Sequence, residues 1–170
     1  SEFRHSCVYL DIETDGGKTG KAITTIGMYD GTNFTCLVKN DGLESFRDII
    51  SKYSMIVTFY GSAFDLPMLA SRFPDVLFDQ IHIDLCFTLR QLGIRGGLKK
   101  IEKMLGISRG EDTDGLDGLD AIRLWKKWEW SKDEAALNQL IAYNREDVVN
   151  LETLAEIAYN RLSRLTRHIG

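Results

Sequence analysis

The sequence lacks paired cysteines, long apolar runs and a signal-peptide pattern. Its three cysteines, Cys7, Cys36 and Cys86, are isolated, with no Cys-x-x-Cys pair and no zinc-ligand spacing to a histidine. This pattern argues against a disulfide framework and a zinc module, and it predicts a reducing, cytoplasmic location. No apolar run approaches the roughly 18 residues that would suggest a membrane span, and no signal-peptide pattern opens the chain. We therefore expect no membrane partner.

An excess of positive charge is also missing. The net charge is −4, from 21 Lys and Arg against 25 Asp and Glu, so the chain has no broad basic field to attract polyanions. Nucleic acid would have to bind locally or through metal ions. The 170 residues, 44% hydrophobic and 27% charged, are typical of one globular domain. We expect a single domain over residues 1–170, with residues 1–5 a tag remnant or a disordered lead.

Hydrophobic patterning predicts strands first and then alternating strands and helices. Asp30-Gly31 is a strong hairpin signal between the second and third strands. This order predicts an α/β layered fold, with a mixed central sheet of an antiparallel hairpin plus parallel strands, flanked by helices. A polar, glycine-rich loop covers residues 108–118. Strands are predicted over 6–13, 22–29, 34–38, 55–60 and 76–83, and helices over 43–52, 64–72, 85–92, 98–105, 119–129 and 132–162.

Acidic residues interrupt the first predicted strand. Asp11 and Glu13 follow an apolar, β-branched and aromatic run that ends at a turn signal. Because side chains alternate along a strand, both carboxylates point to the same face. Two unpaired charges at the end of a central strand are costly, so a cation should accompany them, and a divalent metal does so directly.

Asp65 follows a buried strand and opens a helix, which allows two interpretations. Carboxylates at strand ends, in the crevice of an α/β sheet, are well placed for a ligand site. Aspartate is also favoured as a helix cap. The residues around Asp65 leave both open.

Asp147 lies on the apolar row of the last predicted helix, with Tyr143 one turn before it. The carboxylate should therefore face the core and need a partner, either an arginine or lysine or a metal shared with Asp11. Glu146 is turned about 100° away and is expected to be solvated. Tyr143 is either a core tyrosine with a hydrogen-bonded hydroxyl or part of a site.

Three motifs in this order resemble the DEDD, or DnaQ-like, superfamily of 3′→5′ exonucleases, which have the ribonuclease H-like fold. The resemblance covers about residues 7–160, and the tyrosine four residues before the last aspartate matches the branch with Tyr at the general-base position. Within it the chain looks closest to the YprB-like ribonuclease H-like exonuclease domain, through residues 98–102, 105–107 and 143–154. The motifs are Asp11-Ile12-Glu13-Thr14, Phe64-Asp65 and Tyr143-Asn144-Arg145-Glu146-Asp147.

The resemblance implies hydrolysis of DNA or RNA by a two-metal mechanism. Two Mg²⁺ or Mn²⁺ ions would be held by four carboxylates: Asp11 bridges both ions, Glu13 and Asp147 complete one, and Asp65 holds the other. Tyr143 would orient or deprotonate the attacking water. The substrate would be a single-stranded 3′ end of DNA or RNA, and the protein would act as a monomer. A protein partner or a neighbouring domain is a further candidate for an interaction.

Further residues are candidates for substrate contacts around the carboxylates. They are Thr14, Gly61, Phe64, Lys99 and Lys100. The two lysines and Arg95 form either a phosphate-binding patch or a solvated helix start. Asp84 is expected to cap a helix or to serve as an outer-shell carboxylate.

One position departs from the family pattern. Many relatives carry Asn where this chain has Gly61, so a side-chain hydrogen bond to substrate is missing. A catalytically idle nuclease-fold module that binds nucleic acid or protein is therefore the alternative function, and an endonuclease of the same fold is a third.

Overall fold

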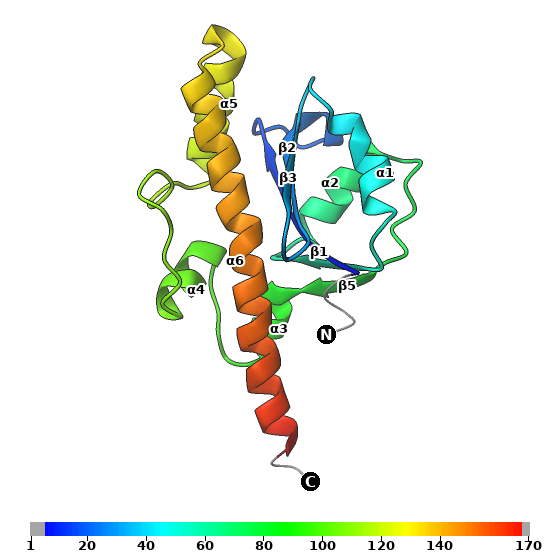
Figure 1. Ribbon diagram of the computed structural model, residues 1–170, viewed down its shortest axis with the longest axis vertical. Helices are drawn as coiled ribbons and strands as arrows, with labels where there is room; N and C mark the ends of the chain where they lie inside the picture. Colours follow the sequence, from blue (N-terminus) through cyan, green and yellow to red (C-terminus); the bar gives the residue numbers. More distant parts are fainter. Residues whose placement is uncertain (1–5, 168–170) are drawn as a thin grey trace.

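The computed structural model describes residues 6–167, which form a five-stranded sheet with helices on both faces (Figure 1). The strand order is β3-β2-β1-β4-β5. β1 pairs antiparallel with β2, which pairs antiparallel with β3, whereas β1–β4 and β4–β5 are parallel. This mixed sheet confirms the predicted fold class.

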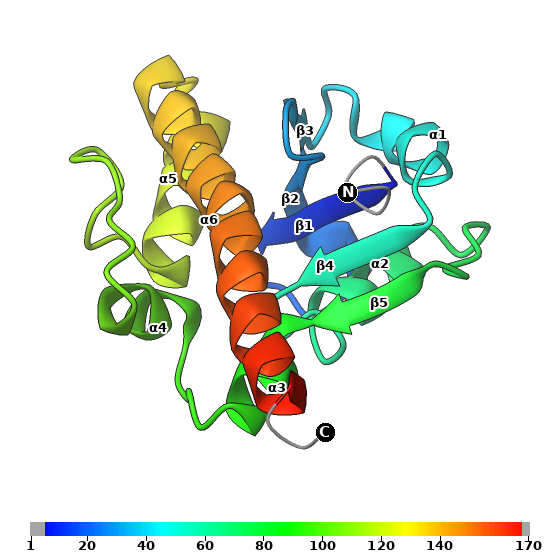
Figure 2. The same ribbon diagram turned by 60° about the horizontal axis from the view of Figure 1, so that its bottom comes forward.

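The strands are β1 (Cys7–Thr14), β2 (Ile23–Tyr29), β3 (Phe34–Val38), β4 (Met55–Thr58) and β5 (Ile81–Asp84). The helices are α1 (Phe46–Ile50), α2 (Asp65–Arg72), α3 (Leu85–Gln91), α4 (Leu98–Met104), α5 (Gly118–Ser131) and α6 (Glu134–Arg167), with 3₁₀ turns η2 (Gly20–Ala22) and η3 (Leu43–Ser45). α1 and α2 cover one face of the sheet, and α6 crosses the other (Figures 1 and 2). Within residues 6–167, no helix is both long and apolar enough to cross a membrane.

Successive side chains of β1 point to opposite faces of the sheet. Val8, Leu10 and Ile12 are buried in the cluster that α1 and α2 cover. Cys7 and Tyr9 are buried in the cluster beneath α6. Asp11 and Glu13 continue this second row, so the strand aims both carboxylates at the long helix.

Close packing of α6 on β2 depends on one glycine. A Cβ built on Gly27 would lie 2.3 Å from Oδ1 of Asn144, closer than any real contact. Gly27 is paired with Asp11 in the neighbouring strand. The glycine therefore lets the helix approach the sheet where the acidic row lies.

Most predicted elements agree with the structure within two residues. Two strands and one helix have different bounds, and the last helix, expected over 132–162, spans Glu134–Arg167. The strand expected over 55–60 ends at Thr58, because Tyr60 has φ +62° and leaves the sheet direction. The strand expected from 76 begins at Ile81, where pairing with β4 starts. The helix expected over 43–52 is split into η3 and α1. The Asp30-Gly31 hairpin is confirmed, and Asp30 Oδ1 accepts the N–H groups of Thr32 and Asn33.

Candidate active site

Three acidic side chains meet where β1 ends under α6. One carboxylate oxygen each from Asp11, Glu13 and Asp147 lies within 4.8 Å of the other two. Glu13 and Asp147 are buried, and Asp11 is half-buried. The packing of α6 on β1 thus brings together side chains from the two ends of the chain.

Asp65 lies beside these three carboxylates but outside their group. It is buried, and its Oδ1 accepts the N–H of Ile12 at 2.9 Å. The N-cap position of α2 is Phe64, so the interpretation of Asp65 as a cap is wrong. Its hydrogen bond instead ties the start of α2 to β1. Asp65 lines a cavity of about 320 Å³ together with Asp11, Glu13 and Asp147.

Asp147 has two cationic partners. Lys99 Nζ donates to Asp147 Oδ1 at 3.1 Å, and the guanidinium of Arg109 donates to the same oxygen. Lys99 is 35% exposed, whereas Arg109 is only 4% exposed. The expectation that a core-facing aspartate needs a cation is therefore met by protein side chains.

Arg109 is held in place by a second carboxylate. Its Nε and one terminal nitrogen donate to the two oxygens of Glu102 at 2.7 and 2.6 Å, and Asn150 donates to Glu102 at 3.1 Å. Sequence reasoning missed this buried network. The available signal was that Arg109 is the only basic residue in the loop 108–118, although it is 38 positions from the Asp147 that needed a cation.

Glu146 contacts the same loop, contrary to the expectation that it would be solvated. This side chain is not simply solvated, because its Oε1 accepts the N–H of Gly110 at 2.9 Å. Glu146 therefore anchors the loop segment next to Arg109. Two neighbouring acids of α6 hold two neighbouring residues of one loop.

Asn144 is a second residue whose contact the sequence did not reveal. It is fully buried, and its Nδ2 donates to the backbone oxygen and to Oδ2 of Asp11, both at 3.2 Å. Its Oδ1 accepts from the thiol of Cys36 at 3.5 Å. The residue was visible inside the Tyr143–Asp147 motif, but its direction relative to β1 depends on how α6 crosses the sheet. Asn144 orients the Asp11 carboxylate.

Tyr143 is buried and also lines the acidic cavity. Lys99 Nζ lies 4.5 Å from its ring centroid, and the guanidinium carbon of Arg109 lies 5.6 Å away. Burial, and then the charges of Asp147, Glu13 and Asp11, raise the pKa of its hydroxyl above the usual value. The hydroxyl is thus protonated at neutral pH in the metal-free protein.

Burial and mutual repulsion also raise the pKa values of the carboxylates. Burial, followed by the charge of Asp147, raises the pKa values of Asp11 and Glu13 well above their usual range. Burial raises the pKa of Asp65 to about 7, against the opposing hydrogen bond from Ile12. A divalent cation would relieve this repulsion, and Mg²⁺ and Mn²⁺ prefer oxygen ligands. The group of Asp11, Glu13 and Asp147 therefore fits such an ion.

The turn from β4 to α2 holds the predicted substrate residues Gly61 and Phe64. A Cβ on Gly61 would lie 2.3 Å from Thr58 Oγ1, which itself accepts the Gly61 N–H, so this turn has no room for a side chain there. Phe64 is 42% exposed and lines the cavity. Asp84 accepts the N–H of Cys86 and caps α3, and it also binds the turn at Tyr60.

The remaining substrate candidates are not brought together. Lys99 lines the acidic cavity, whereas Lys100 and Arg95 are exposed and do not line it. Thr14 Oγ1 accepts the N–H of Gly16 at 3.3 Å in the turn after β1. The structure therefore separates Lys99, which faces the carboxylates, from its neighbour in sequence.

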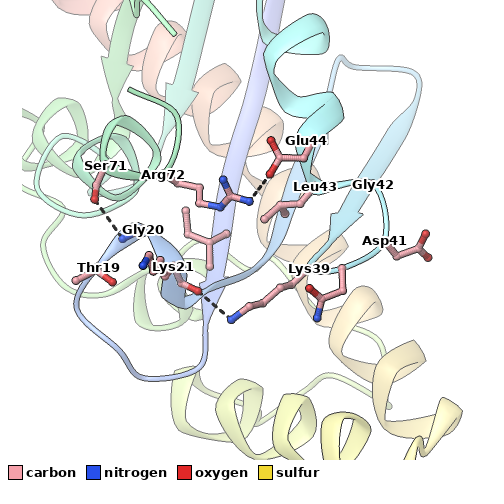
Figure 3. A pocket seen from close by; sticks show the side chains of 12 residues that line it. Thr19, Gly20, Lys21, Lys39, Asp41, Gly42, Leu43, Glu44, Ser71 and Arg72 are labelled. Carbon is pink, nitrogen blue, oxygen red and sulfur yellow. Dashed lines mark hydrogen bonds and ion pairs between the residues drawn. The ribbon is translucent and has the colours of Figure 1, made fainter. Parts of the chain in front are cut away.

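A different cavity of about 970 Å³ opens beside α2 (Figure 3). Three of its charged side chains have partners: Arg72 binds Glu44, and Lys39 Nζ donates to the backbone oxygen of Lys21 at 2.9 Å. The acidic cluster does not line it. The acidic residues that could carry chemistry therefore lie at the smaller cavity and not at this one.

Sequence comparison decides the family. The family model RNase_H_2, described as RNase_H superfamily, matches residues 8–159. The chain belongs to the RNase_H superfamily. No curated protein matches its sequence. The superfamily assignment agrees with the mixed sheet and confirms the ribonuclease H-like fold.

Solved structures of other members of this nuclease fold superpose on the RNase_H chain. The family B DNA polymerase of Pyrobaculum calidifontis has a TM-score of 0.69 at 16% identity, covering 88% of this chain and 24% of the polymerase. Brucella melitensis NrnC has a TM-score of 0.62 at 19% identity, covering 98% and 78%. Escherichia coli RNase D, an exoribonuclease involved in structured RNA processing, has a TM-score of 0.58 at 16% identity, covering 94% and 41%. At these identities the likeness concerns the fold, and the chain spans about a quarter of the polymerase.

Proposed function

We propose that this chain is a divalent-metal-dependent 3′→5′ exonuclease that hydrolyses phosphodiester bonds at the 3′ end of single-stranded DNA or RNA. The observation that carries the proposal is the group of Asp11, Glu13 and Asp147 oxygens within 4.8 Å of one another, with Asp65 in the same cavity. NrnC has been solved with bound Mg²⁺ and with pGG, which supports both the metal and the substrate class.

Asp11, Glu13, Asp65 and Asp147 would hold two divalent ions. Such ions would supply positive charge to the attacking and leaving oxygens of a phosphodiester. Glu13 and Asp147 would hold one ion and Asp65 the other. Asn144 orients Asp11 through its 3.2 Å hydrogen bond, and the hydrogen bond from Ile12 does the same for Asp65.

Tyr143 would orient the attacking water. The water oxygen bonds to phosphorus and gives up a proton to solvent, the bond to the 3′ oxygen of the preceding nucleotide breaks, and that oxygen leaves with the electron pair and takes up a proton from solvent. Because the pKa of Tyr143 is raised by burial and by Asp147, the tyrosine acts first as a hydrogen-bonding group. It would take the proton itself only if metal charge lowered its pKa. We also propose that the chain belongs to the Tyr-type, YprB-like branch of the DEDD exonucleases.

A second candidate has its own supporting observation. Lys99 and Arg109 already neutralise Asp147, as expected of a catalytically idle module that binds nucleic acid without a metal. An endonuclease of the same fold is the third candidate function.

End-labelled single strands separate the three functions. DNA and RNA labelled at the 5′ end are incubated with Mg²⁺ or Mn²⁺, with Asp11→Asn as the matched control. We expect shortening one nucleotide at a time from the 3′ end, abolished in Asp11→Asn. Internal cuts would indicate the endonuclease. Binding without cleavage under every metal condition would indicate the idle module.

A further inference from the structure

Two exposed aromatic side chains lie beside the acidic cavity. Tyr60, in the turn after β4, is 49% exposed, and Phe87, on α3, is 42% exposed. Their ring centroids are 6.4 Å apart, with 40° between the ring planes. We call this pair the aromatic shelf. Tyr60 also lines the cavity that contains Asp11 and Asp65, so the shelf is continuous with the candidate active site.

One carboxylate holds the two halves of the shelf in a fixed relation. Asp84 Oδ1 accepts the N–H of Tyr60 at 2.7 Å, and its Oδ2 accepts from the N–H and hydroxyl of Ser62 at 3.1 and 2.6 Å. Oδ1 also accepts the N–H of Cys86, at the start of the helix that carries Phe87. Asp84 therefore ties the turn to α3, and the shelf is pre-organised.

The backbone at Tyr60 is strained. Its φ is +62°, a left-handed conformation that is a genuine outlier for a bulky residue and costs free energy. Glycine would make the same turn without that cost. The Tyr60 ring is half exposed, so core packing does not account for it.

Positive charge lies along the same edge. The guanidinium of Arg90 lies 5.3 Å from the centroid of the Phe87 ring, and its side chain is exposed. The exposed Arg95 follows in the loop that leads to α4. Rings with neighbouring cations suit a strand whose bases stack and whose phosphates are charged. An apolar peptide would use the rings but not Arg90.

We propose that Tyr60 and Phe87 form a stacking subsite for bases of single-stranded nucleic acid next to the 3′-terminal nucleotide, with Arg90 contacting a phosphate beside them. This subsite rests on the proposed nuclease function, because the acidic cavity sets where the 3′ end lies. Stacking on both rings requires unpaired bases. The shelf therefore selects single strands over blunt duplexes.

Abasic substitution tests the subsite directly. Labelled single strands of about ten nucleotides, within the usual site size for such proteins, carry one abasic unit at successive positions from the 3′ end. Binding is measured by fluorescence anisotropy with Ca²⁺ replacing Mg²⁺, and the strand is checked for integrity. We expect one or two positions at which the wild-type protein loses roughly 5- to 100-fold in affinity, the scale of one base–aromatic stack. In Tyr60→Ala the intact strand should bind that much more weakly, and the position-specific loss should disappear.

Three variants control for the fold and for the ring. Tyr60→Phe keeps the ring and should bind as the wild type. Tyr60→Gly removes the backbone strain, so it should unfold at the same or a higher temperature while binding as weakly as Tyr60→Ala. Tyr159→Ala removes a more exposed tyrosine, 72% exposed on α6, and should leave binding unchanged.

The outcomes separate the subsite from the nuclease function. Exonuclease cleavage with no abasic penalty, or with no effect of Tyr60→Ala, would overturn the subsite and leave the function standing. A position-specific penalty that Tyr60→Ala removes, without cleavage in Mg²⁺ or Mn²⁺, would keep the subsite and reject the exonuclease. A wild-type protein that binds no single strand, or binds an apolar peptide in its place, overturns the subsite.

Discussion

At the scale of single residues, the site is organised by how its charges are paired. Asp147 is paired with the cations Lys99 and Arg109, whereas the Asp11 side chain accepts a hydrogen bond from the neutral amide of Asn144. Lys99 is partly exposed, and Arg109 is locked against Glu102. We therefore expect Lys99, rather than Arg109, to release Asp147 when a metal ion or a substrate phosphate arrives.

Tyr143 and Asp147 lie one helical turn apart, and substitutions at the two positions should affect activity in different ways. Tyr143→Phe should keep the fold and metal affinity but lose about 10²–10⁴ in rate, the usual scale for one acid–base group. Asp147→Asn should lose affinity for one ion and be partly restored by excess Mn²⁺. Single-turnover cleavage across a metal series measures both. Full activity in Tyr143→Phe would make it a packing residue only.

Arg109 should be a large contributor to stability. Arg109→Met would leave Glu102 buried without its cation and Asp147 with Lys99 alone, and removing one partner of a buried pair usually costs about 3–5 kcal/mol. Urea unfolding of the metal-free protein measures the loss. Arg123→Met is the matched control, because that arginine is 74% exposed and pairs with Asp120 at the surface, where such pairs contribute about 0–1 kcal/mol. Equal effects in the two variants would contradict the role of Arg109.

At the scale of elements, the site depends on how closely α6 lies on the sheet. The helix supplies Tyr143, Asn144 and Asp147, and β1 supplies Asp11 and Glu13. Gly27 of β2 provides the space in which Asn144 reaches Asp11. A change at that contact should affect packing and carboxylate position together.

Gly27→Ala should therefore destabilise the protein. Its Cβ would overlap the buried amide of Asn144, and overpacking of this kind costs about 1–3 kcal/mol. Gly118→Ala is the control, since a Cβ at the start of α5 would meet nothing within 4 Å. Thermal unfolding of both variants makes the comparison. A Gly27→Ala protein as stable as Gly118→Ala would show that α6 adjusts freely.

At the scale of the whole molecule, the buried carboxylates link stability to pH. The pKa of Asp65 is raised to about 7 by burial, so between its unfolded pKa of about 4 and pH 7 the folded state binds more protons than the unfolded state. Stability of the metal-free protein from this group is therefore greatest at low pH and is lost as pH rises through 7. His82, whose pKa is lowered by burial, acts in the opposite direction.

Comparison with Asp65→Asn separates these contributions, because both proteins retain His82. Without metal, lowering the pH from about 8 to about 6 should raise the unfolding temperature of the wild type by a few degrees more than that of Asp65→Asn, since about 1 kcal/mol corresponds to roughly 2–4 °C at this size. Mn²⁺ should stabilise the wild type most at the higher pH, where the ligands are ionised. Parallel pH profiles for the two proteins would contradict the raised pKa of Asp65.

The sequence by itself determined the fold class and the direction of most site side chains. Strand alternation put Asp11 and Glu13 on one face, and helical spacing put Tyr143 and Asp147 on one row. Both are properties of an element's own geometry, with periods of about 2.0 and 3.6 residues. The order of the three motifs indicated the nuclease fold that the superfamily match confirms.

Only the tertiary structure decided which residues those side chains meet. Asn144 and Asp11 are 133 positions apart, and Lys99 and Asp147 are 48 apart. No local period relates such pairs, because their distance depends on where the helix crosses the sheet and where the loops run. For the same reason, the sequence did not predict the Glu102–Arg109 pair or the contact of Tyr60 with Phe87. Local pattern orients a side chain relative to its own element, and packing alone selects its partner.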